Sequence, residues 1–223
     1  MTLKLFIEAI LKFTLGVVLI GLLIFLPAGT LAFTGGWLLM GILFIPMFIA
    51  GLVMMAKNPS LLASRLDAKE KEREQSIVVK LSGLMFILGF VLAGLDFRFG
   101  WVKLPFAVNI IAAVVFIIAY IIYAEVLREN SYLSRTIKVV EGQKVVSTGL
   151  YGIVRHPMYF ATLLLFMSIP FVLGSLISFI VFLAYPVIIS KRIKNEEEVL
   201  TRELEGYEEY KQKVKYRLIP FIW

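Results

Sequence analysis

The run from Pro157 to Ser190, PMYFATLLLFMSIPFVLGSLISFIVFLAYPVIIS, decides the fold, because it is almost entirely apolar over 34 residues. At about 1.5 Å per residue, a single helix of this length would be about 51 Å long, whereas the hydrocarbon core of a bilayer is about 30 Å thick. Its middle holds Pro170, Gly174 and Ser175, residues that favour a break. The run therefore predicts two short or tilted membrane helices that form a tight hairpin.

Further apolar runs precede the hairpin, and each is about as long as one membrane span. They are Leu3 to Leu26, Trp37 to Ala56, Ile77 to Leu95 and Leu104 to Leu127. The first is too long for the apolar core of a signal peptide and lacks a clear cleavage site, so we predict that it is a retained span. Apolar residues make up 60% of the 223 residues and the mean hydropathy is +0.88, more than the polar surface of a soluble domain allows. The sequence thus predicts an all-α integral membrane protein with about six transmembrane helices.

Two parts of the chain are expected to have different roles. Residues 1–127 form the predicted N-terminal transmembrane region of four helices. Residues 128–223 comprise a loop, the helical hairpin and a C-terminal tail. The apolar residues of the tail follow a helical spacing, at Leu200, Leu204, Tyr207, Tyr210 and Val214. We therefore predict a helical tail that covers the polar end of the hairpin or rests on the membrane surface.

Two connecting stretches also have recognisable patterns. Ser60 to Gln75 carries charges of both signs and predicts a solvated surface helix without chemistry of its own. Ser134 to Val140 alternates loosely like an extended strand, and Glu141-Gly142-Gln143 then predicts a turn.

Basic residues are distributed unevenly over the predicted loops. Segments 57–80, 128–156 and 191–223 carry 6, 5 and 8 of the 23 lysines and arginines. Six spans place all three segments on one side together with both termini, and the positive-inside rule makes that side cytoplasmic. Much of the net charge of +7 follows from this bias and suits contact with anionic membrane lipids, so a nucleic-acid partner need not be invoked.

The composition also excludes several kinds of site. Cysteine is absent and histidine occurs once, which argues against disulfides, thiol nucleophiles and a cysteine or histidine metal centre. A glycine-rich phosphate loop and a dinucleotide fingerprint are both missing, so a soluble Rossmann-type cofactor domain is not expected.

Polar residues gather at both ends of the hairpin. Tyr151, Arg155, His156 and Tyr159 crowd the entrance to its first helix, where Pro157 suits the first helical turn. Each of them alone is typical of an interfacial anchor. Past the second helix, Arg192 and Glu196 lie four residues apart, and in isolation they could be an ordinary helical ion pair. Because a hairpin returns the chain to the side that it left, we expect the two clusters to meet in one site.

These residues carry a family resemblance. The pattern Gly149-x-Tyr151-x-x-x-Arg155-His156-Pro157-x-Tyr159, an apolar hairpin, Arg192-x-x-x-Glu196-Glu197-x-x-Leu200, Tyr207-x-x-Tyr210 and Arg217-Leu218-Ile219-Pro220 resembles the isoprenylcysteine carboxyl methyltransferase family, which is related to membrane phospholipid N-methyltransferases. The resemblance covers roughly the C-terminal 90 residues. Two positions depart from it: Ala161 stands where a glycine is common, and Leu204-Glu205-Gly206-Tyr207 replaces the more usual Phe-Gly-x-x-Tyr.

The resemblance implies a binding site for S-adenosylmethionine on the cytoplasmic side. By motif position, the residues that line the cofactor are Gln143, Lys144, Val145, Val146, Tyr151, His156, Pro157, Met158 and Tyr159. Glu196 is then expected to hold the polar end of the cofactor, and Arg192 to face the methyl acceptor, so Arg192 and Glu196 are the expected catalytic residues. Their chemistry fits, since aromatic faces accommodate a sulfonium cation and a guanidinium suits a carboxylate.

The acceptor and two other functional classes remain open at this level. A carboxylate such as that of a prenylated cysteine is already ionised at neutral pH and needs no general base, whereas a phospholipid amine must lose a proton, which Glu196 or Glu197 could take. Membrane sterol-type reductases, which use NADPH, share a similar Arg-His-x-x-Tyr segment, although Pro157 and the Glu196-Glu197 pair favour the methyltransferase. A non-catalytic transporter or scaffold is disfavoured because few charges lie within the spans and paired broken helices are not evident.

Overall fold

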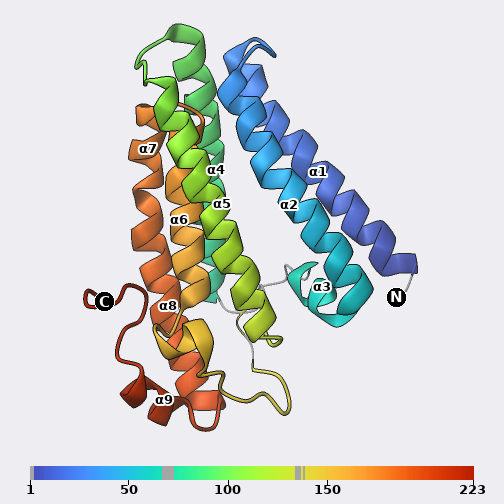
Figure 1. Cartoon of the computed structure of the whole chain (residues 1–223), viewed down its shortest axis with the longest axis vertical. Helices are drawn as coiled ribbons and strands as arrows, with labels where there is room; N and C mark the ends of the chain where they lie inside the picture. Colours follow the sequence, from blue (N-terminus) through green and yellow to red (C-terminus); the bar gives the residue numbers. More distant parts are fainter. Residues whose placement is uncertain (1–2, 67–72, 134–136, 138) are drawn as a thin grey trace.

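The computed structural model describes residues 3–66, 73–133, 137 and 139–223, whose regular secondary structure is entirely helical (Figure 1). In chain order the elements are α1 (Leu3–Ala28), α2 (Thr34–Lys57), α3 (Pro59–Leu66), α4 (Arg73–Phe99), α5 (Phe106–Glu129), the short 3-10 turn η1 (Gly149–Gly152), α6 (Pro157–Val172), α7 (Leu176–Phe182), α8 (Ala184–Glu203) and α9 (Tyr207–Lys213).

The helices confirm a multi-pass integral membrane protein. The segments long and apolar enough to cross a bilayer, among the described residues, are α1, α2, Ser76–Phe99 of α4, α5, and α7 with α8 taken together from Leu176 to Glu203. Helix α6 is also apolar but has only 16 residues. Five spans are therefore evident by length and composition, and the count of six stays a prediction.

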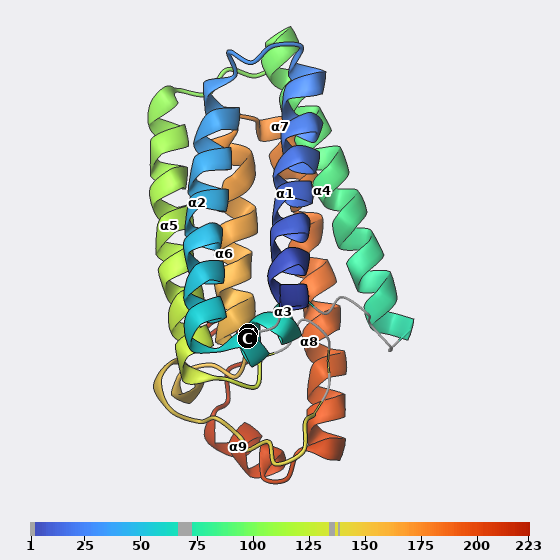
Figure 2. The same ribbon diagram turned by 90° about the vertical axis from the view of Figure 1, so that its right-hand side faces the viewer.

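The apolar run from Pro157 folds as a hairpin, as predicted. Helix α6 and the α7–α8 arm lie side by side and run in opposite directions (Figures 1 and 2). The turn between them uses Gly174, whose φ of 75° is in the left-handed region that favours glycine. Ser175 follows and caps α7, since its Oγ accepts a hydrogen bond from the Ser178 N–H over 3.1 Å. Pro170, which was expected to contribute to the break, lies inside α6.

The second arm of the hairpin is longer than the apolar run predicts and is divided in two. Helix α7 ends and α8 begins around Leu183, three residues before Pro186. Proline has no N–H to donate to the carbonyl one turn earlier, which explains the division. Helix α8 then continues past Ser190 to Glu203, so Arg192 and Glu196 lie inside this helix rather than beyond it.

The bundle consists of two groups of helices. Helix α5 packs on α6, and α4 packs on α7 and α8 around a core that includes Phe116 and Phe182. Helices α1 and α2 form a pair that joins this group through α4 and α5 (Figure 2). Asn58 ends α2 and also caps α3, because its Oδ1 accepts a hydrogen bond from the Leu61 N–H over 3.1 Å.

Both marked ends of the chain lie in the half of the molecule that contains α3 and α9 (Figure 1). The predicted tail is helical, in the last turns of α8 and in α9, with a break at Leu204 to Gly206 that the apolar spacing did not indicate. Gly206 takes a φ of 82°, which lets α9 fold back. The predicted turn at Gly142 is confirmed by a hydrogen bond from the Gln143 N–H to the Val140 carbonyl over 3.0 Å. Ile137, Val139 and Val140 form no regular strand. The rest of that predicted strand (134–136 and 138) and most of the charge of the predicted surface helix (67–72) lie outside the described residues. Of the surface helix predicted over Ser60 to Gln75, the structure shows α3 and the start of α4.

Candidate active site

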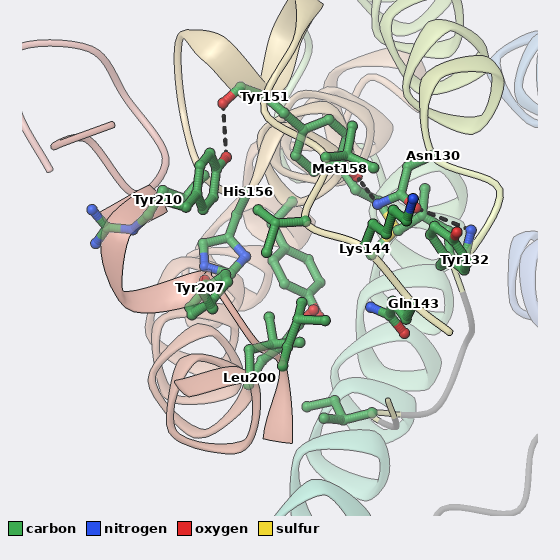
Figure 3. Close-up of a pocket in the computed structure, with 18 of the residues that line it drawn as sticks. Asn130, Tyr132, Gln143, Lys144, Tyr151, His156, Met158, Leu200, Tyr207 and Tyr210 are labelled. Atoms are coloured by element: carbon green, nitrogen blue, oxygen red, sulfur yellow. Dashed lines mark hydrogen bonds between the residues drawn. The ribbon is translucent and has the colours of Figure 1, made fainter. Parts of the chain in front are cut away.

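A pocket opens at the end of the bundle that holds α9 (Figure 3). Its walls come from the loop between α5 and η1, from η1, from the first turn of α6, and from α8 and α9. The space between its atoms is about 810 Å³, a volume that includes the part open to solvent. The pocket thus lies where the hairpin, the loop after α5 and the C-terminal tail meet.

The structure brings almost all the predicted site residues into this pocket. Those that line it are Gln143, Lys144, Val145, Val146, Tyr151, His156, Met158, Tyr159, Arg192 and Glu196. Pro157 does not line it, because it is the first residue of α6 and lies buried in the helix start. The two ends of the hairpin thus meet at one pocket, and Pro157 is the predicted residue that lies outside its lining; the cofactor-binding and catalytic roles stay predictions.

The two predicted clusters meet at the hydroxyl of Tyr159. This hydroxyl donates a hydrogen bond to Glu196 Oε2 and accepts one from Arg192 Nε over 2.9 Å. The Arg192 guanidinium carbon also lies 6.0 Å from the centroid of the Tyr159 ring. A residue of α6 thereby fixes the positions of a cation and a carboxylate on α8. The arrangement holds opposite charges in register on one pocket wall.

A second carboxylate, Glu197, forms a buried ionic cluster beside this wall. Its Oε1 accepts from Arg155 Nε over 2.7 Å and lies 3.2 Å from His156 Nε2, and its Oε2 accepts from Arg217 Nε over 2.8 Å. The Glu197 side chain is only 6% exposed. A buried charge of this kind is tolerated because it is paired and hydrogen-bonded. Glu197 therefore joins α8, the start of α6 and the C-terminal tail.

The tail is also fixed to Arg155 and His156 through main-chain groups. The N–H groups of Arg155 and His156 each donate over 2.9 Å to the carbonyls of Tyr216 and Arg217. Arg155 Nη1 donates to the carbonyls of Val214 and Lys215 over 2.7 and 2.9 Å. The segment after α9 is thus held against the entrance of α6, where it supports the pocket.

Helix α9 closes the pocket with aromatic side chains. Tyr207 and Tyr210 pack with Leu204 and Val214 in a small core of their own. Tyr210 donates its hydroxyl hydrogen to the Tyr151 carbonyl over 2.7 Å (Figure 3). Burial raises the pKa of the Tyr207 and Tyr210 hydroxyls above the usual tyrosine value, and it does the same at Tyr151. These hydroxyls are therefore neutral at physiological pH and remain hydrogen-bond donors.

The hydroxyl of Tyr207 has no hydrogen-bond partner within the described part of the chain. Tyr207 lines the pocket and is 4% exposed, yet its Oη makes no hydrogen bond to any residue that the structure describes. A buried polar atom without a partner is costly, and native structures rarely leave one unless a ligand or water completes it. Together with the carboxylate of Glu196 and the surrounding tyrosine rings, this hydroxyl fits a ligand that carries both polar and cationic groups.

Several residues line the pocket although they were not among the predicted cofactor-binding or catalytic residues. Asn130, Tyr132, Leu133 and Ile137 were not singled out at all, whereas Arg155 was placed in the first polar cluster and Leu200, Leu204, Tyr207 and Tyr210 in the covering tail. Glu197 was predicted as a motif residue and a possible proton acceptor, and the structure makes it the centre of the ionic cluster. One signal was present: the helical spacing of Ile193, Glu197 and Leu200 places Glu197 on the apolar, inward face of α8.

The fold and the pocket together define the class: a helical multi-pass membrane protein with a polar, aromatic-lined ligand pocket at one end of its bundle. Residues 101–202 match the isoprenylcysteine carboxyl methyltransferase (ICMT) family, so this part of the chain is ICMT-like, as its motifs predicted. The matched stretch contains α5 and the whole hairpin up to Arg202, and it ends before α9.

The chain is also similar to a curated protein, the Delta(14)-sterol reductase TM7SF2 of Mus musculus. The two are 28% identical over 91 residues, which is 40% of this chain. The similar region spans only 22% of the length of the mouse protein.

Proposed function

We propose that this protein transfers a methyl group from S-adenosylmethionine to a lipophilic acceptor, namely the carboxylate of a prenylated cysteine or a similar compound. The observation that carries the proposal is the pocket, which gathers the predicted cofactor residues within and next to the ICMT-like stretch. The matching family is by its name a family of methyltransferases.

The pocket residues have the chemistry to hold this cofactor. S-adenosylmethionine, when bound, supplies a methyl group on a positively charged sulfur. The rings of Tyr151, Tyr159 and Tyr207 offer aromatic faces to such a cation. Glu196 offers a carboxylate to the ammonium group of the methionine part. The unpartnered Tyr207 hydroxyl supplies a further donor.

Arg192 is the proposed contact of the acceptor carboxylate. Its guanidinium is oriented by Tyr159, to which Arg192 Nε donates over 2.9 Å. An ionised carboxylate is already a nucleophile, so no side chain has to remove a proton from it. Bound S-adenosylmethionine would supply the methyl group for the carboxylate oxygen, and its sulfur would leave with the electrons of the carbon–sulfur bond. Catalysis then consists mainly of alignment, which the fixed Tyr159, Arg192 and Glu196 side chains provide.

Calorimetric titration with S-adenosylmethionine tests the cofactor assignment directly. We expect the detergent-solubilised wild type to bind, and Glu196→Ala and Tyr159→Ala to weaken binding about tenfold or more, because each removes a charged or aromatic contact. Glu198→Ala is the matched control, since Glu198 lies on the same helix but is exposed. Well-folded wild type that binds no S-adenosylmethionine would refute the proposal.

The similarity to a sterol reductase supports a second candidate, an NADPH-dependent membrane reductase. Titration of the same samples with NADPH distinguishes the two, because a ligand that binds the folded state raises its thermal stability. Stabilisation by NADPH without stabilisation by S-adenosylmethionine would replace the methyltransferase with the reductase. An amine acceptor, such as a phospholipid headgroup, is the alternative substrate within the methyltransferase proposal.

We further propose that the pocket and both marked chain ends face the cytoplasm, which the positions of the basic segments support. The absence of cysteine allows a clean test with single introduced cysteines. The positions chosen for Gln212→Cys, in α9, and Lys103→Cys, in the loop before α5, are both exposed. In intact cells, a membrane-impermeant maleimide should label the cysteine at 103 but reach the one at 212 only after permeabilisation. The reverse pattern would invert the topology.

A further inference from the structure

Helix α3 connects the N-terminal part of the chain to the pocket. The Ser64 hydroxyl donates to the Leu133 carbonyl over 3.3 Å, and Arg65 Nη1 lies 3.9 Å from the sulfur of Met158. Leu133 and Met158 both line the pocket. Because α3 precedes residue 101, it belongs to a part of the chain that the family match does not cover. The pocket therefore has a border that the ICMT-like stretch does not supply.

Arg65 stands out at this border because its partners are uncharged. Its guanidinium donates to the hydroxyl of Tyr123 and lies 5.6 Å from the centroid of the Tyr123 ring. Its other contact is the Met158 thioether, a weak acceptor. Across the described ranges, Arg65 forms no ion pair with a carboxylate. In contrast, Arg155 and Arg217 at the same end of the bundle both pair with Glu197.

A partly buried arginine without an anion is an unfavourable arrangement in a protein by itself. Removal of a guanidinium from water has a cost that a paired anion offsets, and its planar fork matches a carboxylate with two parallel hydrogen bonds. Arg65 is partly buried and touches a residue of the pocket wall. The missing anion can therefore come from a ligand in the pocket.

We propose that Arg65 recognises the anionic group of the acceptor and selects carboxylate acceptors against amines. The inference rests on the proposed function and deepens it, because it adds a specificity-determining residue to the acceptor side of the same pocket. With Arg192, it gives that side two cations, which attract a carboxylate and repel an ammonium group. Ester formation would remove the charge that Arg65 binds, which favours release of the product.

Direct binding to a matched pair of probes tests this proposal. The protein in lipid nanodiscs is titrated with N-acetyl-S-farnesylcysteine, which carries a carboxylate, and with the methyl ester of the same compound, which is uncharged. The wild type should bind the acid about tenfold more tightly than the ester, the equivalent of about 1.4 kcal/mol, because only the acid can form a charge-assisted hydrogen bond. Arg65→Gln should lose most of this preference, and Arg65→Lys should retain part of it.

Arg128→Gln is the control, because Arg128 lies at the same end of α5 as Tyr123, the partner of Arg65. Its side chain is 72% exposed and pairs with Glu125, so the acid preference should not change in this variant. Wild type that binds the acid and the ester equally, or neither, overturns the proposal, and so does Arg65→Gln that keeps the full preference.

Titration with S-adenosylmethionine is carried out on the same samples and is read separately. Arg65→Gln should bind the cofactor like the wild type, because the contacts of Arg65 are Tyr123 and Met158 and not Glu196 or Tyr207, which are proposed to hold the polar groups of the cofactor. If the wild type binds no cofactor, the methyltransferase proposal fails, whereas the comparison of acid and ester still decides the role of Arg65.

Discussion

The two ends of the bundle both bury polar side chains, but they differ in how those side chains are satisfied. At the hairpin turn, Asp96 is 2% exposed and accepts hydrogen bonds from the Ser175 hydroxyl over 2.6 Å and from the Val102 N–H over 2.9 Å. Asn109 donates to the Val172 carbonyl over 2.9 Å, and Ser178 donates to the Gly89 carbonyl over 2.9 Å. This network of short side chains closes the turn.

The pocket end is built from long ionisable and aromatic side chains instead. Glu197 pairs with Arg155 and Arg217, whereas Tyr207 retains a hydroxyl without a partner among the described residues. A satisfied network rigidifies a structure, and an unsatisfied group beside a cavity leaves a place for a ligand. The comparison shows that buried polar groups alone do not identify a binding site. A buried hydrogen-bonding group that has no protein partner and borders a pocket does.

The largest effect is expected from the residue that holds the pocket end together. Glu197→Gln leaves Arg155 and Arg217 without their anion, and loss of one member of a buried ion pair costs about 3–5 kcal/mol. Thermal unfolding in detergent should show a large destabilisation, and S-adenosylmethionine binding should weaken because the tail docks through this cluster. Glu203→Gln, which affects only an exposed pair with Arg202, should change stability by at most about 1 kcal/mol. Equal stability of the two variants would show that the Glu197 ion pairs do not stabilise the pocket end.

The second-largest effect should show that the hairpin turn contributes to stability and not to cofactor binding. Asp96→Ala removes the acceptor for the Ser175 hydroxyl and the Val102 N–H, and each unsatisfied buried donor costs about 1–3 kcal/mol. We therefore expect a lower unfolding temperature with a dissociation constant for S-adenosylmethionine that stays within about twofold of the wild type. A selective loss of cofactor binding without loss of stability would show that the turn and the pocket are coupled.

The smallest effect should come from the unpartnered hydroxyl. Tyr207→Phe removes an atom that bonds to no described residue, so stability should be unchanged or slightly higher. If that hydroxyl binds the cofactor, affinity should fall about fivefold, the equivalent of one hydrogen bond worth about 1 kcal/mol. Calorimetry alongside thermal unfolding measures both quantities. Unchanged affinity would mean that the ligand does not use Tyr207.

Much of this architecture could be predicted because it depends on periodic or composition-wide signals. The apolar runs predicted the long helices, and Gly174 with Ser175 predicted the turn of the hairpin. The hairpin topology in turn predicted that Tyr159 would meet Arg192 and Glu196, and hydrogen bonds join all three. These inferences needed only chain direction and helix geometry.

The remaining features depend on one-residue differences in orientation or on distant contacts. Successive helical residues point about 100° apart, so Glu196 faces the pocket while Glu197 turns toward Arg155. Contact between Arg65 and Met158 joins residues 93 positions apart. The break before α9 also escaped prediction, because the spacing of its tyrosines fits one continuous helix equally well.

The shortness of α6 determines how deep the pocket lies in the membrane. Its 16 residues reach only about 24 Å, whereas the hydrocarbon core is about 30 Å thick. If the turn at Gly174 is level with one headgroup region, then Met158 and Tyr159 lie about 6 Å below the other. Under the proposed function, an acceptor with its chain in the bilayer could then reach the pocket without leaving the membrane. The proposed methyl transfer should accordingly respond to the acyl-chain length of the surrounding lipids, since a thicker bilayer places the pocket further from the aqueous phase on its own side.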